Sequence, residues 1–162
     1  MLNWLYSFTT QKQNISLIKA AFTAVKYGQL KDLQNLLERG VSANSRNTRG
    51  LTLLHMCILT TTEHNEEYML PLTALLISYD ADVNACYTKN DETYGPLHSA
   101  VRRKIPLSTK LLLENNADLF MTDKRNKTPL DYANDAEFGN DRGEVIRELL
   151  QEKLPRNTYG LS

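Results

Sequence analysis

The chain has 162 residues, of which 41% are hydrophobic and 23% are charged. This composition is typical of one folded globular domain and excludes a largely disordered chain. Nineteen basic and nineteen acidic side chains cancel at neutral pH. No overall charge therefore draws the chain toward nucleic acid or toward a membrane surface.

The first eight residues are apolar but few, and the following residues 9–14 are polar. This beginning lacks the basic leader and cleavage site of a secretory signal. No segment approaches the ~18 consecutive apolar residues that span a membrane. Cys57 and Cys86 are too few for a disulfide framework, so we expect free thiols in a reducing compartment. These observations predict a soluble cytoplasmic protein, with the nucleus as an alternative location.

Hydrophobic periodicity along the rest of the chain predicts eight helices in four consecutive pairs. Leu33, Leu36 and Leu37 share one stripe of a helix, and Gly40 follows where a helix would need a left-handed stop. Pro96 and Pro129 suit first helical positions, where the missing N–H costs nothing. The expected pairs are 17–26 with 30–39, 53–60 with 68–78, 96–103 with 106–115, and 129–135 with 142–153.

Three hexapeptides recur along the chain: Thr-Leu-Leu-His-Met-Cys at 52–57, Gly-Pro-Leu-His-Ser-Ala at 95–100 and Thr-Pro-Leu-Asp-Tyr-Ala at 128–133. Each is followed by a Leu/Ile pair, and a further pair, Leu36-Leu37, lies upstream. The second and third hexapeptides are 33 residues apart, whereas the first and second are 43 apart. Such a recurrence is the mark of a repeat architecture.

These hexapeptides, their spacing and their Leu/Ile pairs resemble the ankyrin repeat, whose unit is a turn and two helices with a T-P-L-H-x-A motif. The resemblance implies an all-α ankyrin-repeat solenoid of about four stacked helix pairs with projecting turns. It implies repeats at about 17–44, 45–84, 85–120 and 121–154, which together form one repeat domain over 17–154. Residues 1–16 are then an N-terminal extension or cap, and residues 155–162 are a flexible tail.

Four positions depart from the repeat pattern: Leu53 replaces proline, Gly95 replaces threonine, Asn126 replaces the turn glycine, and Phe120 stands where Asn44 and Asn84 stand in earlier units. Extra residues also lie around 60–67 and 137–140. We expect these departures to alter local turns and not the stack. The segment 60–67 is either a surface insertion without function or part of a binding face.

No pattern in the chain predicts catalysis. His55 and Cys57 lie two apart on a helix and point away from each other, so they do not form a zinc site with His64, His98 or Cys86. The glycines form no phosphate-binding loop, and no nucleophile motif is present. We therefore expect no catalytic residues, no metal site and no cofactor. A metal-dependent enzyme is the alternative from a different functional class.

A solenoid binds its partners on the concave face made by its turns and first helices. By register with the ankyrin pattern, the turns are 45–50, 86–94 and 121–127. Their basic residues predict a stripe that grips an acidic or phosphorylated protein segment, partly offset by Asp91, Glu92 and Asp123. Tyr94 is a further aromatic candidate. The predicted partner-binding residues are Arg46, Arg49, Met56, Tyr87, Lys89, Ser99, Arg102, Arg103, Lys124, Arg125 and Tyr132. The alternative is that these charges only keep the stack soluble.

The resemblance thus implies a non-enzymatic protein-interaction module, monomeric alone, that inhibits, sequesters or chaperones a partner protein. One alternative is a recruitment adaptor that links two proteins through two surfaces. Another is a microbial or viral ankyrin protein that acts on host regulatory factors. Membrane binding is not expected, and nucleic-acid binding is not favoured because no recognised motif accompanies the basic stripe.

Overall fold

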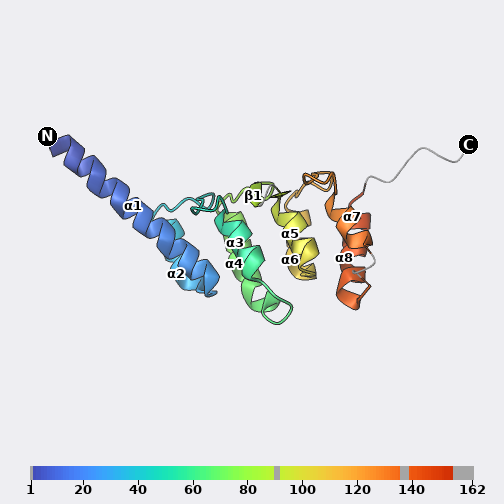
Figure 1. Cartoon of the computed structure of the whole chain (residues 1–162). Coiled ribbons are helices and arrows are strands. Elements are labelled where there is room, and N and C mark those ends of the chain that lie inside the picture. Colours follow the sequence, from blue (N-terminus) through green and yellow to red (C-terminus); the bar gives the residue numbers. More distant parts are fainter. Residues whose placement is uncertain (1, 90–91, 136–138, 155–162) are drawn as a thin grey trace, which may run out of the picture.

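The computed structural model describes the backbone of residues 2–89, 92–135 and 139–154, and the side chains of 13–87, 94–135 and 139–154. Within this part, four helix pairs follow one another along the molecule (Figure 1). The pairs are α1 (Leu2–Lys26) with α2 (Leu30–Glu38), α3 (Leu53–Thr60) with α4 (Glu66–Ser78), α5 (Pro96–Arg102) with α6 (Pro106–Glu114), and α7 (Pro129–Asn134) with α8 (Asp141–Glu152). A short antiparallel hairpin, β1 (Tyr87–Lys89) and β2 (Glu92–Tyr94), projects between the second and third pairs.

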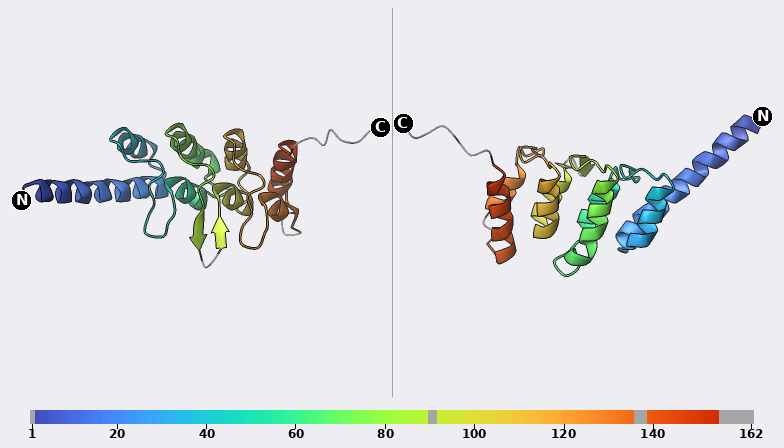
Figure 2. Two further views of the ribbon diagram at one scale, coloured as in Figure 1. Left: turned by 90° about the horizontal axis from the view of Figure 1, so that it is seen from above. Right: turned by 180° about the vertical axis from the view of Figure 1, so that it is seen from behind.

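The helices form two rows. The first helices of the pairs, α1, α3, α5 and α7, pack in sequence against one another, and so do the second helices, α2, α4, α6 and α8. Each first helix also packs against its own second helix. The projecting turns lie on one side of the first row, and the second row lies on the other (Figure 2). This arrangement confirms the predicted all-α solenoid of four stacked pairs.

One apolar core runs through all four pairs. Leu33, Leu76, Leu112 and Leu150 come from different repeats, and each is fully buried in this core. Small side chains occupy the first helices where neighbouring repeats approach most closely. These fully buried small residues are Ala21, Cys57, Ala100 and Ala133. Because every pair shares its apolar face with a neighbour, the stack itself supplies the core.

The threonines that begin two of the hexapeptides cap their helices. The Thr52 hydroxyl accepts a hydrogen bond from the His55 backbone N–H, and Thr128 and Asp131 form a reciprocal capping box at α7. Both arrangements satisfy backbone N–H groups that a helix N-terminus leaves unpaired. Gly40 has a φ of 91°, as expected for a left-handed stop after α2.

Two asparagines link consecutive turns. The Asn44 side chain donates to the carbonyl oxygen of Asp80 at 2.8 Å and accepts from the Asp82 N–H at 2.7 Å. The Asn84 side chain repeats this pattern with Asn116 and Asp118 of the next repeat, at 3.2 and 2.8 Å. We call these four bonds the asparagine ladder. Phe120 stands at the corresponding position of the third repeat, and its side chain has no amide to continue this pattern.

Two elements differ from the predicted bounds by two residues or more. Helix α1 begins at Leu2 and not near residue 17, so the predicted boundary at 16/17 falls inside a helix. The division of the chain into repeats itself stays a prediction. Helix α4 begins at Glu66, two residues earlier than predicted, which shortens the extra segment after α3. The predicted tail at 155–162 lies outside the described residues.

The extra segment after α3 packs against later repeats. Arg103 donates from Nε and Nη2 to the Thr61 carbonyl oxygen, at 2.9 and 2.8 Å. The Glu66 carboxylate is 3% exposed, accepts from the Ser108 N–H at 3.0 Å and forms an ion pair with Arg142. Segment 60–67 therefore has a structural role in joining three repeats, whether or not it also binds a partner.

Candidate functional site

The surface made by the first helices and the projecting turns, here called the turn face, begins at turn 45–50. Arg46 in this turn donates from Nη1 to the carbonyl oxygens of Gly50 and Cys86, at 2.7 and 2.9 Å. It thereby connects the first turn to the second. Arg49 of the same turn is exposed.

The second turn is the β1–β2 hairpin, whose tyrosines form a small cluster of their own. Tyr87 and Tyr94 face each other across the hairpin and are buried together with Leu51. The Tyr87 ring also lies edge-on to His55, with 4.8 Å between the ring centroids. His55 Nε2 is 3.3 Å from the Tyr94 carbonyl oxygen. The base of the hairpin is therefore fixed against α3.

Arg102, the last residue of α5, lies between this cluster and the next repeat. Its guanidinium carbon is 4.8 Å from the ring centroid of Tyr94 and 5.2 Å from that of Tyr132 on α7. Lys127 Nζ lies 5.3 Å from the same Tyr132 ring and forms an ion pair with Asp135 at 3.0 Å. Aromatic rings and cations thus alternate across two repeats. We call this set the aromatic–cation row: Tyr87, Tyr94, Arg102, Tyr132 and Lys127.

Tyr132 is held in place by a buried acid. Its hydroxyl donates to the carboxylate of Asp123, which is 4% exposed. Asp123 also accepts from the N–H groups of Arg125 and Lys127, at 2.8 and 3.0 Å, and so shapes turn 121–127. Burial and the hydrogen bond to Asp123 raise the pKa of Tyr132 to about 12. The hydroxyl therefore remains a protonated donor at physiological pH.

His98 beneath the row shows the effect of a departure from the repeat motif. Its Nε2 lies 3.2 Å from the Lys127 carbonyl oxygen, but its buried Nδ1 has no partner among the described residues. In the preceding repeat, the matching His55 Nδ1 meets the Thr52 hydroxyl at 2.8 Å. Gly95 offers no such hydroxyl, and the Met121 sulfur lies only 2.9 Å from where a Cβ of residue 95 would be. Methionine thus takes the space of the missing threonine.

The predicted partner-binding residues divide by position. Tyr87, Arg102 and Tyr132 come together in the aromatic–cation row, while Ser99 is buried and Met56 is partly buried against the core. Arg103 points to Thr61 and not along the row. The remaining basic residues keep their predicted places in the turns, where Lys124 and Arg125 are exposed; the Lys89 side chain lies outside the described side chains.

Lys127 is the row member that sequence reasoning missed. The sequence did contain a signal for it, because Lys127 lies directly before the Thr128 cap and inside the predicted turn 121–127.

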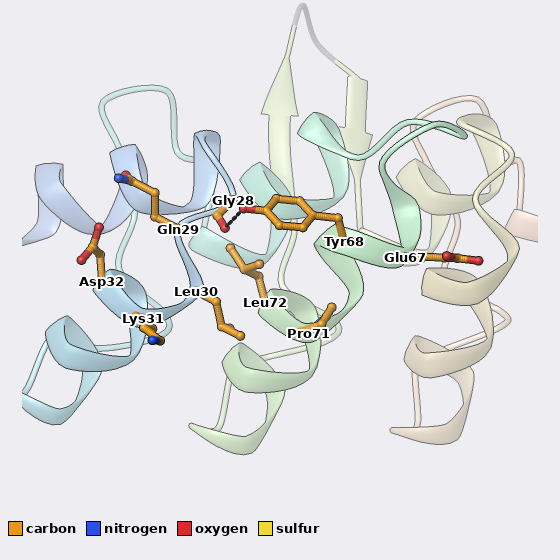
Figure 3. Close-up of a pocket in the computed structure, with 9 residues that line it drawn as sticks. All are labelled: Gly28, Gln29, Leu30, Lys31, Asp32, Glu67, Tyr68, Pro71 and Leu72. Carbon is orange, nitrogen blue, oxygen red and sulfur yellow. Dashed lines mark hydrogen bonds between the residues drawn. The ribbon is translucent and has the colours of Figure 1, made fainter.

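Two cavities lie near helices of the first two repeats. One, of about 380 Å³, joins apolar residues of α1 to the first turn and is lined by Ile15, Ile18, Lys19, Phe22, Thr23, Arg46, Asn47 and Thr48. The other, of about 630 Å³, lies between the first turns of α2 and α4 in the second row (Figure 3). Leu30, Tyr68, Pro71 and Leu72 line it, and the Tyr68 hydroxyl closes one edge by donating to the Gly28 carbonyl oxygen at 2.8 Å.

In the part of the chain that the structure describes, we looked for groups that could bind a metal ion and for a reactive thiol. No group of three or more His, Cys, Asp or Glu residues there could hold a metal ion. Burial raises the pKa of Cys57 to about 11, which keeps its thiol protonated and unreactive. Among the described helices, none is both long and apolar enough to span a bilayer.

The stacked pairs, the hexapeptide turns and the asparagine ladder define a helical repeat protein. Comparison with known proteins agrees: the ankyrin repeat family, in three copies, matches residues 21–123. The chain belongs to the ankyrin repeat family. The fourth pair, α7 and α8, lies beyond the matched residues but stacks in the same way. Ankyrin repeats are protein–protein interaction modules, and this chain is one.

A relative from Acanthamoeba polyphaga mimivirus, named as an ankyrin repeat protein, is 34% identical over 97 residues. The matched region covers 60% of this chain and 11% of the viral protein. The chain thus matches only about a tenth of that relative's length.

Proposed function

We propose that the chain is a non-enzymatic regulator that binds an acidic or phosphorylated segment of a partner protein on its turn face. The observation that carries this proposal is the aromatic–cation row, in which Arg102 lies over two tyrosine rings from neighbouring repeats. Tyrosine and arginine are the side chains that most often dominate binding energies at protein interfaces. Occupying the partner's surface would inhibit, sequester or chaperone it.

A cavity supports this choice of face. The cavity beside turn 45–50 places apolar residues of α1, Ile18 and Phe22, next to the Arg46 turn, so one segment of the partner could make both apolar and charged contacts.

Both Cys57 and Cys86 are free thiols, which supports a location in a reducing compartment, the cytoplasm or the nucleus. The proposed regulator is a monomer when it is alone. Because the matched relative is viral, a host regulatory factor is the first partner class to test.

Site-specific photo-crosslinking tests the binding face. A photoreactive phenylalanine analogue is placed at the exposed turn positions Thr48 and Thr122, and in a control at Asn35, which is exposed on α2. In lysate from the cells that express the chain, we expect one protein to crosslink from both turn positions and not from Asn35. Crosslinking from Asn35 alone would contradict the proposal.

A recruitment adaptor is the second candidate, and the cavity between α2 and α4 favours it. This cavity lies in the second row of helices, whereas the turns lie on the other side of the first row (Figures 2 and 3). Two surfaces could therefore hold two proteins at once. A ternary complex that survives gel filtration, and loses one component on Leu30→Asp and the other on Arg102→Glu, would support the adaptor over the regulator.

A further inference from the structure

We infer that Arg102 is the anchor of the turn face and that it binds one carboxylate, from an aspartate or glutamate of the partner. This inference deepens the proposed function and rests on it. It selects between the acidic and the phosphorylated segment and assigns the contact to a single side chain.

Within the described part of the chain, the donors of Arg102 have no acceptor, whereas four other arginines donate to backbone carbonyl oxygens. Arg46, Arg103 and Arg142 each donate to carbonyl oxygens of neighbouring segments. Arg147 likewise donates to the Ala133 carbonyl oxygen. Among the described residues, Arg102 contacts two aromatic rings but has no hydrogen-bond acceptor and no ion-pair partner. As far as the described residues go, its N–H groups are thus left for an acceptor from outside.

The two rings under Arg102 are held rigidly. Tyr94 is 5% exposed and packs with Tyr87 in the hairpin cluster, and Tyr132 is fixed by its hydrogen bond to buried Asp123. An arginine side chain ordinarily gives up rotamer freedom when it is immobilised. Contact with two fixed rings restricts Arg102 before any partner arrives, so less of that entropy is lost on binding.

The charge of the site favours a carboxylate over a phosphate. Lys127, the second cation at the Tyr132 ring, is paired with Asp135, and the Asp123 carboxylate lies at the Tyr132 hydroxyl, so two negative charges already offset part of the positive charge beside the rings. A carboxylate carries one negative charge, whereas a phosphomonoester carries about 1.5 to 2 at neutral pH. The guanidinium of Arg102 can meet a planar carboxylate through two parallel hydrogen bonds.

The test measures binding of fluorescent peptides by anisotropy at neutral pH and low salt. The probes are octaglutamate and a peptide with four phosphoserines, which has a similar total charge. Arg102→Gln removes the charge, Arg102→Lys keeps the charge without the fork, and Arg39→Gln is the matched control at an exposed arginine at the end of α2. Circular dichroism verifies that each variant is folded, and the Nε–Hε resonance of Arg102 reports the contact directly.

We expect wild-type protein to prefer octaglutamate. Arg102→Gln should weaken that binding at least tenfold, Arg102→Lys should weaken it several-fold, and Arg39→Gln should change it less than twofold. Preference for the phosphoserine peptide, equal losses in Arg102→Gln and Arg39→Gln, or wild-type affinity in Arg102→Lys would each overturn the assignment.

The two proposals fail in different ways. If octaglutamate does not bind while Thr48 and Thr122 still crosslink a protein, the carboxylate assignment is wrong and the binding face stands. If octaglutamate binds at Arg102 but the turn positions crosslink nothing, the regulatory function is wrong.

Discussion

His55 shows how one buried side chain makes the stability of the stack depend on pH. Burial, together with the nearby charge of Arg46, lowers its pKa from an ordinary value of about 6.5 to about 4. The folded protein therefore keeps His55 neutral where the unfolded chain already binds a proton. Protonation of the unfolded chain favours unfolding, so stability is constant above pH ~6.5 and falls as the pH decreases toward 4.

We expect the free energy of unfolding to be about 1 kcal/mol lower at pH 5.5 than at pH 7.5 from His55 alone. His98 has a pKa lowered mainly by burial and adds to the loss with the same sign. The pKa values of the Asp123 and Asp131 carboxyls are also lowered, so their contributions disappear only below pH ~4. Urea unfolding at the two pH values measures the difference.

The control for this pH effect is His55→Gln, which lowers stability but removes the titrating group. Its unfolding free energy should vary less between the two pH values than that of the wild type. Equal stability of the wild-type protein at both values would show that His55 is not kept neutral by folding.

Arg102 and Arg103 are adjacent in sequence but have different roles in the structure. The sequence predicted equivalent binding roles for Arg102 and Arg103, but only Arg102 lies against the tyrosines. Arg103 instead donates to Thr61, which is 42 residues away. Sequence spacing describes which face of a helix a residue occupies, but it does not identify a carbonyl group that another repeat brings near. For this reason the basic stripe could be predicted, whereas the single anchor that we propose within it could not.

At the scale of elements, the asparagine ladder joins the turns of the first three repeats. Asn84→Ala removes both hydrogen bonds to the third repeat, so we expect a loss of about 2 kcal/mol in unfolding free energy. The control is Asn35→Ala on the exposed face of α2, whose side chain makes no hydrogen bond within the described part of the chain. That variant should change stability by less than about 0.5 kcal/mol. Equal effects in urea titrations would contradict the role of the ladder.

A second connection between elements is the ion pair of Glu66 and Arg142. Glu66 on α4 also accepts a hydrogen bond from the Ser108 N–H on α6, so one carboxylate joins the second helices of three repeats. Removing one member of a buried pair costs about 3–5 kcal/mol. The Arg142 side chain is 31% exposed and can recover hydration, so we expect Glu66→Gln to cost about 2 kcal/mol.

Glu67→Gln is the matched control, because it changes the same chemistry one residue away at an exposed position. Thermal unfolding should separate the two variants by several degrees. If Glu66→Gln is as stable as Glu67→Gln, the three-repeat connection contributes nothing measurable.

The bounds of α3 could be predicted because a local cap, Thr52, and a local hydrophobic pattern define them. The beginning of α1 could not, because residues 9–14 are polar and interrupt that pattern. Polar residues do not end a helix, and no glycine or proline precedes Gly28. The beginning of α4 was missed for a related reason. Glu66 belongs to an acidic, insertion-like segment, and its partners lie 42 and 76 residues away.

At the scale of the whole molecule, the stack is nearly one-dimensional, since each pair packs mainly on its neighbours. The stability of such a protein is close to a sum of repeat and interface contributions. A change in an end repeat should therefore have a local effect, and the same change in an inner repeat should have a broader one. Leu76 on α4 and Leu150 on α8 allow a matched comparison, because both are leucines at 0% exposure.

We expect both Leu76→Ala and Leu150→Ala to remove about 3 kcal/mol of local stability, because each leaves a cavity in the core. Native-state hydrogen exchange followed by mass spectrometry shows where that loss appears. In Leu150→Ala, protection should fall in α7 and α8, and in the first turn of α4 through the Glu66–Arg142 pair, while α1 and α2 at the opposite end keep theirs (Figure 1). In Leu76→Ala, protection should fall on both sides of α4, because the inner repeat supports neighbours in both directions. Equal loss in α1 and α8 after Leu150→Ala would mean that the molecule unfolds as one unit and that its repeats are not separable.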